Sequence, residues 1–151
     1  MEELTSPEID FVILADRAEA VNGRLYMMGG GFDRLHVATF EAPVEFSVAL
    51  GVLVPWIAAN EHHRLLVGIE HEDGRPVDKA IEIGLNVGRP PTAIPGQSFR
   101  ATIAIQAAIK LPGPGGYCVS ARVGDHSPRR TVFYATPVEI VGGLRAVPPK
   151  E

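Results

Sequence analysis

The sequence predicts an all-β protein, an immunoglobulin-like sandwich of two antiparallel sheets with about eight strands, with a jelly roll as the alternative. Three observations support this prediction. Apolar and polar residues alternate in several segments, turn signals separate these segments, and Gly (16) and Pro (13) are abundant among the 151 residues. A hydrophobic content of 46% is enough for one domain with a real core. We therefore expect residues 1–151 to form one domain, with about 1–8 and 143–151 as loose tails.

Alternation identifies the individual strands. From Phe99 to Leu111 every residue on one parity is apolar, which is typical of a strand with one buried face. Phe11–Ala15 and Thr131–Val141 are apolar on both parities, as strands covered on both faces are. Only Trp56–His63 tolerates a short helix. The remaining predicted strands are Leu25–Phe32, Val44–Val54, Arg64–Glu72, Lys79–Val87 and Tyr117–Val123.

Turn residues separate these strands. Asp73-Gly74 lies between two alternating runs and predicts a tight hairpin. The sequence Pro112-Gly113-Pro114-Gly115-Gly116 is incompatible with a helix or a central strand, and residues 124–128 close the next hairpin. Gly29–Gly31 lacks the residues that follow the glycines of a phosphate-binding loop, so we interpret it as a bulge or a close approach of backbone.

Charge and cysteine content indicate the compartment and exclude some partners. The net charge of −4 disfavours nucleic-acid binding. Cys118 is the single cysteine, so no internal disulfide can form. The acidic N-terminus does not resemble a signal peptide, and no apolar run is long enough to cross a membrane. We expect a soluble cytoplasmic protein that does not contact membranes.

Several of these segments together resemble a known family. They are Phe11–Asp16, the stretch from Asn22-Gly23 to Gly29-Gly30-Gly31-Phe32-Asp33, the Glu72-Asp73-Gly74-Arg75 hairpin and the Leu111–Tyr117 turn. The chain is similar to small bacterial β-sandwich proteins catalogued as a domain of unknown function. The resemblance covers most of the chain and implies a fold. It implies no activity, cofactor or catalytic residue.

Histidines are the candidate metal ligands. His62, His63 and His71, with a neighbouring carboxylate such as Glu70, have the right chemistry for a divalent metal, although the spacing of a cupin motif is absent. The alternative is a solvated loop, with His71 at the rim of the core. We favour this alternative and predict neither a metal nor another cofactor.

Two further features are candidates for binding. Arg122, Arg129 and Arg130 lie around one hairpin and form either an anion or partner patch or a solvated hairpin. Trp56, the only tryptophan, is either an interface anchor or a cap on the core. No nucleophile elbow or metalloprotease motif accompanies them, so the sequence favours a protein that is not an enzyme.

The polar faces of the strands carry unusually small residues. Ala104 and Ala108 occupy the polar parity of Phe99–Leu111, where a solvated sheet face normally carries larger polar side chains. We infer that a second subunit, a partner or a loop of the chain itself covers at least one sheet face. The predicted function is therefore a non-catalytic binding or assembly module, a homo-oligomer or a subunit docked on another protein. The alternative is a small-ligand or metal-dependent enzyme that uses His62, His63 and His71.

Overall fold

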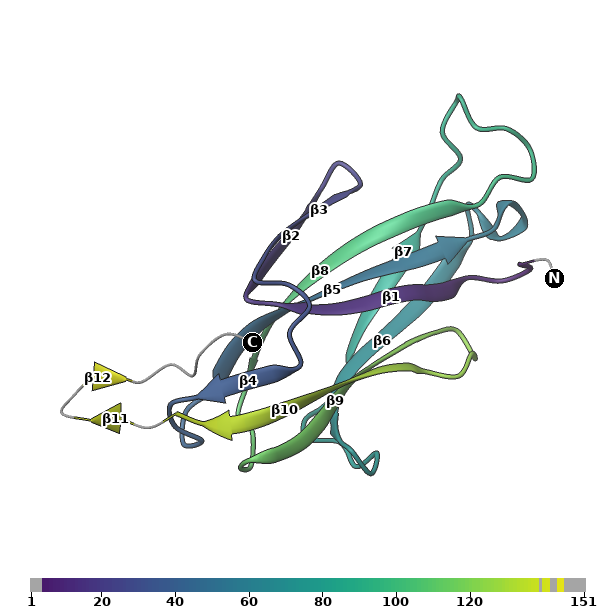
Figure 1. Cartoon of the computed structure of the whole chain (residues 1–151). Helices are drawn as coiled ribbons and strands as arrows, with labels where there is room; N and C mark the ends of the chain where they lie inside the picture. The colour runs from purple at the N-terminus through teal and green to yellow at the C-terminus, as the bar shows by residue number, and fades with distance from the viewer. Residues whose placement is uncertain (1–3, 139, 142–143, 146–151) are drawn as a thin grey trace.

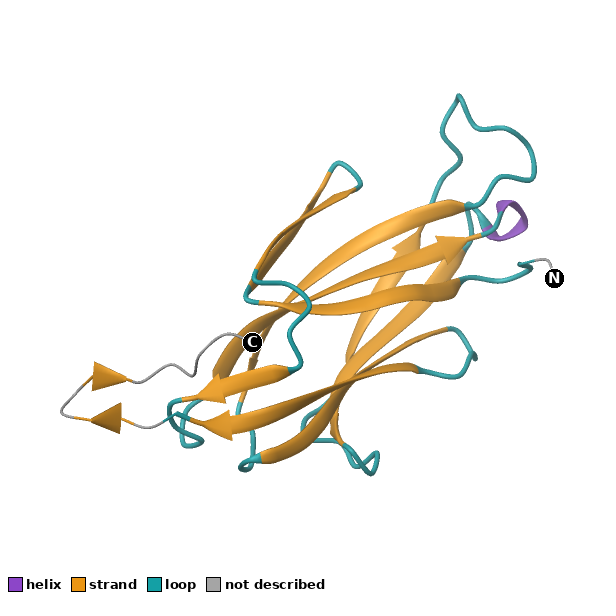
Figure 2. Ribbon diagram, in the orientation of Figure 1, coloured by secondary structure: helices purple, strands orange, loops and turns teal. Residues whose placement is uncertain are grey.

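The computed structural model describes residues 4–138, 140–141 and 144–145, and its regular elements are strands apart from one 3-10 turn, η1 (Trp56–Ala58) (Figure 2). The predicted all-β class is confirmed. The strands are β1 (Glu8–Ala15), β2 (Arg17–Val21), β3 (Arg24–Met28), β4 (Arg34–Val37), β5 (Val44–Val54), β6 (His62–His71), β7 (Ile81–Asn86), β8 (Phe99–Ile109), β9 (Gly115–Val123), β10 (Arg129–Pro137), β11 (Ile140–Val141) and β12 (Leu144–Arg145).

Two principal sheets lie against each other (Figure 1). One sheet has the strand order β1-β5-β8, and the other has the order β4-β10-β9-β6-β7. Neighbouring strands are antiparallel, except that β4 runs parallel to β10. The pairs β2–β3 and β11–β12 form separate two-stranded hairpins.

The hydrophobic core lies between the two principal sheets. The apolar parity of β5, including Phe46, Val48 and Leu50, meets that of β9 and β10, and all of these side chains are buried. The ring of Phe133 in β10 packs against both Phe46 and Tyr117, with centroid distances of 5.7 Å in each case. Strict alternation along the strands therefore places one face of each sheet in the core, as the sequence pattern predicts.

The β2–β3 hairpin is inserted where the chain leaves the first sheet for the second. After β1 the chain bends at Asp16, and β2 contacts both β5 and β8. Ala49 of β5 points away from the core and is fully buried, so we infer that the hairpin lies over the outer face of the three-stranded sheet. The chain returns at Gly29, whose φ is +64°. A side chain there would collide with the carboxylate of Asp16. Glycine at position 29 therefore allows both the positive φ and the close approach of this backbone to the Asp16 side chain.

The turn before β9 is closed by a tyrosine. The hydroxyl of Tyr117 donates a hydrogen bond to the carbonyl oxygen of Gly113 (2.6 Å) and accepts one from the Gly113 amide (3.2 Å). The ring of Tyr117 is buried in the core. One side chain therefore fixes the glycine- and proline-rich turn to the interior of the sandwich.

The structure adds detail that the sequence pattern does not predict. Leu25–Phe32 is not one strand, because β3 ends at Met28 and the glycines follow it. The short strands β2 and β4 were not expected. In the segment expected as an N-terminal tail, residues 1–3 lie outside the described residues, but Pro7 is buried and Ser6 is hydrogen-bonded to His126 (2.7 Å). Of residues 143–151, the structure describes Leu144 and Arg145, which form β12. Within the described residues, no helix is long and apolar enough to cross a bilayer.

Candidate functional site

The β2–β3 hairpin exposes a row of apolar side chains. Its register places Val21, Tyr26 and Met28 on one face, which they share with charged residues including Arg17 and Glu19. The three apolar residues are 46%, 57% and 72% exposed. A two-stranded ribbon of this kind is at best marginally stable by itself. Apolar surface gathered on such a ribbon is typical of a contact site. The Asn22-Gly23 turn is a hairpin signal in the sequence, but we predicted only the strand after it, at Leu25–Phe32, and so missed the hairpin.

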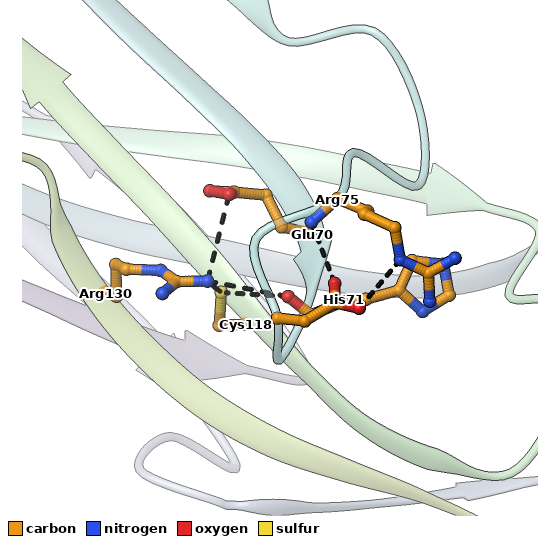
Figure 3. Close-up of polar contacts among 6 residues, drawn as sticks. Glu70, His71, Arg75, Cys118 and Arg130 are labelled. Carbon is orange, nitrogen blue, oxygen red and sulfur yellow. Dashed lines mark hydrogen bonds and ion pairs between the residues drawn. The ribbon is translucent and has the colours of Figure 1, made fainter.

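A polar cluster occupies the outer face of the five-stranded sheet (Figure 3). Arg130 of β10 reaches across β9 toward β6. Its Nη2 atom lies 2.9 Å from Sγ of Cys118 and 3.8 Å from a carboxylate oxygen of Glu70. The same atom lies 3.5 Å from the carbonyl oxygen of His71. At the end of β6, the carboxylate of Asp73 accepts hydrogen bonds from the amide and the guanidinium of Arg75. These two contacts lower the pKa of Asp73.

Burial favours the neutral form of the thiol in this cluster. Cys118 is 1% exposed, and burial raises the pKa of its thiol, although the Arg130 guanidinium acts in the opposite direction. A nucleophilic cysteine needs a lowered pKa and access to solvent. The Glu70–Cys118–Arg130 cluster therefore does not present an activated thiolate. Its contacts link three neighbouring strands.

A shallow cavity of about 360 Å³ lies beside this cluster on β6 and β9. Its walls carry charges of both signs, including Glu70, Asp78, Lys79 and Arg122. Because opposite charges alternate around it, the cavity has no strong preference for an anion or a cation.

The three predicted arginines do not form one patch. Arg129 and Arg130 are adjacent on a strand and so point to opposite faces of the sheet. Arg129 donates a hydrogen bond to the Ile9 carbonyl of β1 (3.4 Å), while Arg130 belongs to the cluster with Cys118. Arg122 lines the cavity beside that cluster. Strand parity therefore separates Arg129 from Arg122 and Arg130, which lie on the same face of the sheet.

Trp56 is half-buried at one end of the sandwich. The guanidinium of Arg89 lies 4.1 Å above the ring and donates a hydrogen bond to the Trp56 carbonyl (2.6 Å). The Trp56 ring also lies near the ring of Phe99, with 6.1 Å between the two centroids. The ring is therefore already engaged by the chain itself, and its role as an interface anchor stays a prediction.

The small-residue face around Ala104 is partly covered by the chain itself. Ala49, which pairs with Ala104 across β5 and β8, is fully buried although it points away from the core. The crossing of β2 over these two strands explains this burial. Ala104 is half-buried, and Ala108 is exposed. The sequence predicts that such a face is covered by a second subunit, by a partner or by a loop of the chain itself, and the β2–β3 hairpin belongs to the third kind.

His71 lies far from His62 and His63. His62 and His63 begin β6 and His71 ends it. His71 is eight residue positions beyond His63 along the strand, a distance of roughly 26 Å. His63 contacts the Ala58 carbonyl (2.8 Å), whereas His71 stacks near Tyr117. The three residues cannot share one metal ion. Elsewhere in the described residues, no three His, Cys, Asp or Glu side chains are arranged to hold a metal.

Comparison with known proteins identifies the class of this chain. A family model described as "Family of unknown function (DUF6941)" matches residues 10–136. The chain therefore belongs to that family. No curated protein sequence matches it. Among solved structures, it is similar to a β-glucosidase from Listeria innocua in complex with gluconolactone, with 11% identity and a TM-score of 0.45. The match covers 85% of this chain, which corresponds to 16% of the length of the enzyme.

Proposed function

We propose that this protein is a non-catalytic binding or assembly module that acts through protein–protein contacts. The observation that carries the proposal is the set of three exposed apolar side chains, Val21, Tyr26 and Met28, on one face of the β2–β3 hairpin. These side chains lie on a ribbon outside both principal sheets, where they add nothing to the core. A binding partner that covers them would remove apolar surface from water and order the hairpin.

We also propose that the fold is immunoglobulin-like. The orders β1-β5-β8 and β10-β9-β6-β7 correspond to strands A-B-E and G-F-C-C′ of that architecture, which supports the assignment over a jelly roll. Tyr117 adds support, because a tyrosine at the start of strand F that bonds to backbone a few residues upstream is a hallmark of such sandwiches. A cytoplasmic location belongs to the same proposal, and its support is that the single cysteine, Cys118, can form no internal disulfide.

The test compares assemblies recovered from host cells. We would express the wild-type chain, a Tyr26→Ser/Met28→Ser variant and a control, Ile94→Ser, which removes an equally exposed apolar residue from the loop between β7 and β8. Native mass spectrometry at low salt then reports what each chain carries. We expect a stoichiometric partner with the wild type and the control, and its loss from the hairpin variant. Because all three substitutions are exposed, the melting temperature should stay the same. A bare 16.2 kDa monomer in all three samples would contradict the proposal.

A further inference from the structure

The strand β8 presents a long unpaired edge. Its eleven residues pair with β5 along their whole length and without a register shift. β8 is the last strand of its sheet, and none of its backbone groups bonds to a described residue outside β5. The β2–β3 hairpin contacts β8 but forms no strand pairing with it, so the edge stays unpaired. An open edge of this kind is a template for another strand.

The other sheet edges are less suited to strand addition. β4 has four residues and β7 has six. β1 is longer, but an irregularity between Ile9 and Phe11 interrupts its pairing, and Glu8 and Asp10 place acidic groups on it. Short length, irregular pairing and charge are the usual protections of an edge strand. β8 lacks proline and register shifts, and its one charged residue, Arg100, is paired with Asp10 at 2.7 Å.

The core is open below the β8 edge. The inward residues Ile103, Ile105 and Ala107 pack on the core yet remain only half-buried. A cavity of about 210 Å³ adjoins them, and Val67 and Ile81 of the facing sheet line its other side. A strand added to β8 would place alternate side chains over this opening and extend the core. The partner strand must therefore be apolar on the same parity as β8.

We propose that this partner is β8 of a second copy, paired antiparallel about a twofold axis at Ala104. Only this register uses all eleven residues. It places inward residues of one copy opposite inward residues of the other, such as Ile103 opposite Ile105, and it places the small Ala104 opposite Ala104 of the second copy. Arg100 then faces Ala108, so the register brings no like charges together. A twofold contact of one strand with its own copy is an isologous interface, the commonest kind in homo-oligomers.

The experiment is a sedimentation-equilibrium titration up to about 100 µM with paired charge variants. Ala108 is exposed in the single chain, so Ala108→Lys and Ala108→Glu should both fold. In the dimer, Lys at this position opposes Arg100 and Glu complements it. Because symmetry repeats the pair, we expect the dissociation constant to rise about tenfold with Ala108→Lys and to fall with Ala108→Glu. Within the chain, Ala108 pairs with Glu45, so a lysine at position 108 lies beside an opposite charge and should not destabilise the fold. Weaker dimerisation of Ala108→Lys would therefore not result from unfolding.

Disulfide trapping checks the register. Directly opposed residues in an antiparallel pair are about 4.5–5.5 Å apart at Cα, within the range of a disulfide. Ala104→Cys in a Cys118→Ala background should therefore cross-link two copies on mild oxidation, whereas Ala108→Cys should not. A monomer at every concentration would overturn the proposal, as would a dimer that ignores both Ala108 variants and fails to cross-link at position 104. This inference names a partner for the proposed binding module. If the protein is a monomer but still binds another protein through the β2–β3 hairpin, the β8 dimer is refuted and the proposed binding function is not.

Discussion

Substitution of Tyr117 by phenylalanine removes one hydroxyl group from the turn before β9 and leaves the ring packing intact. The hydroxyl makes two hydrogen bonds to Gly113, at 2.6 and 3.2 Å. Each such bond contributes about 1 kcal/mol net, and a partly buried amide and carbonyl left without partners add to the loss. We expect Tyr117→Phe to lower the free energy of unfolding by about 2 kcal/mol. For a domain of this size the melting temperature would fall by about 4–8 °C.

Urea denaturation followed by the fluorescence of Trp56 measures this loss. The midpoint should fall while the slope stays constant, because the folded and unfolded states expose the same surface as before. Tyr134→Phe is the matched control. Its hydroxyl lies 3.4 Å from the Glu72 carboxylate at an exposed position, so its removal should change the stability by less than about 0.5 kcal/mol. Equal midpoints for Tyr117→Phe and the wild type would refute the assigned role of the tyrosine.

Three further substitutions test the core, the hairpin base and the thiol. Phe133→Ala should destabilise by about 3–5 kcal/mol in urea, because the ring is fully buried between two others. Gly29→Ala should destabilise more than Gly23→Ala, since both have positive φ but only Gly29 faces the Asp16 carboxylate; equal effects would contradict this. Folding raises the pKa of the Cys118 thiol, so the neutral thiol contributes stability to the folded state. This contribution is fully present below about pH 8.5 and is lost as pH rises through the folded-state pKa. The melting temperature should therefore fall more steeply from pH 8 to 10 in the wild type than in Cys118→Ala; parallel curves would contradict this.

Much of the fold follows from patterns that are local in the sequence. The apolar parity of Phe99–Leu111 predicts the inward face of β8, and Asp73-Gly74 predicts the turn after β6. β2 and β4 were missed for a physical reason. Arg17–Val21 has only the small Ala18 and Ala20 on its apolar parity, which is a weak strand signal, and Arg34–Val37 becomes a strand only by pairing with β10, far along the chain. Pairings between distant segments leave no local signal.

The candidate surfaces were less accessible to prediction than the fold. Alternation distinguishes inward from outward residues, but it cannot tell whether an apolar row such as Tyr26 and Met28 faces a core or water. Charge clustering along the sequence was misleading for Arg129 and Arg130, because neighbours on a strand lie on opposite faces. The separation of His63 from His71 follows from the length of an extended strand, and that length alone argues against a shared metal site.

The parallel pairing of β4 with β10 has a consequence for synthesis of the chain. Arg34 pairs with Tyr134, so a strand made early must wait for one of the last to be made. A ribosome adds about 5–20 residues per second, so β4 stays unpaired for several seconds before β10 is made. Contacts this distant in sequence also slow the folding of the finished chain. The nascent chain therefore exposes unpaired strand edges during translation, and these seconds are when a chaperone has most to protect.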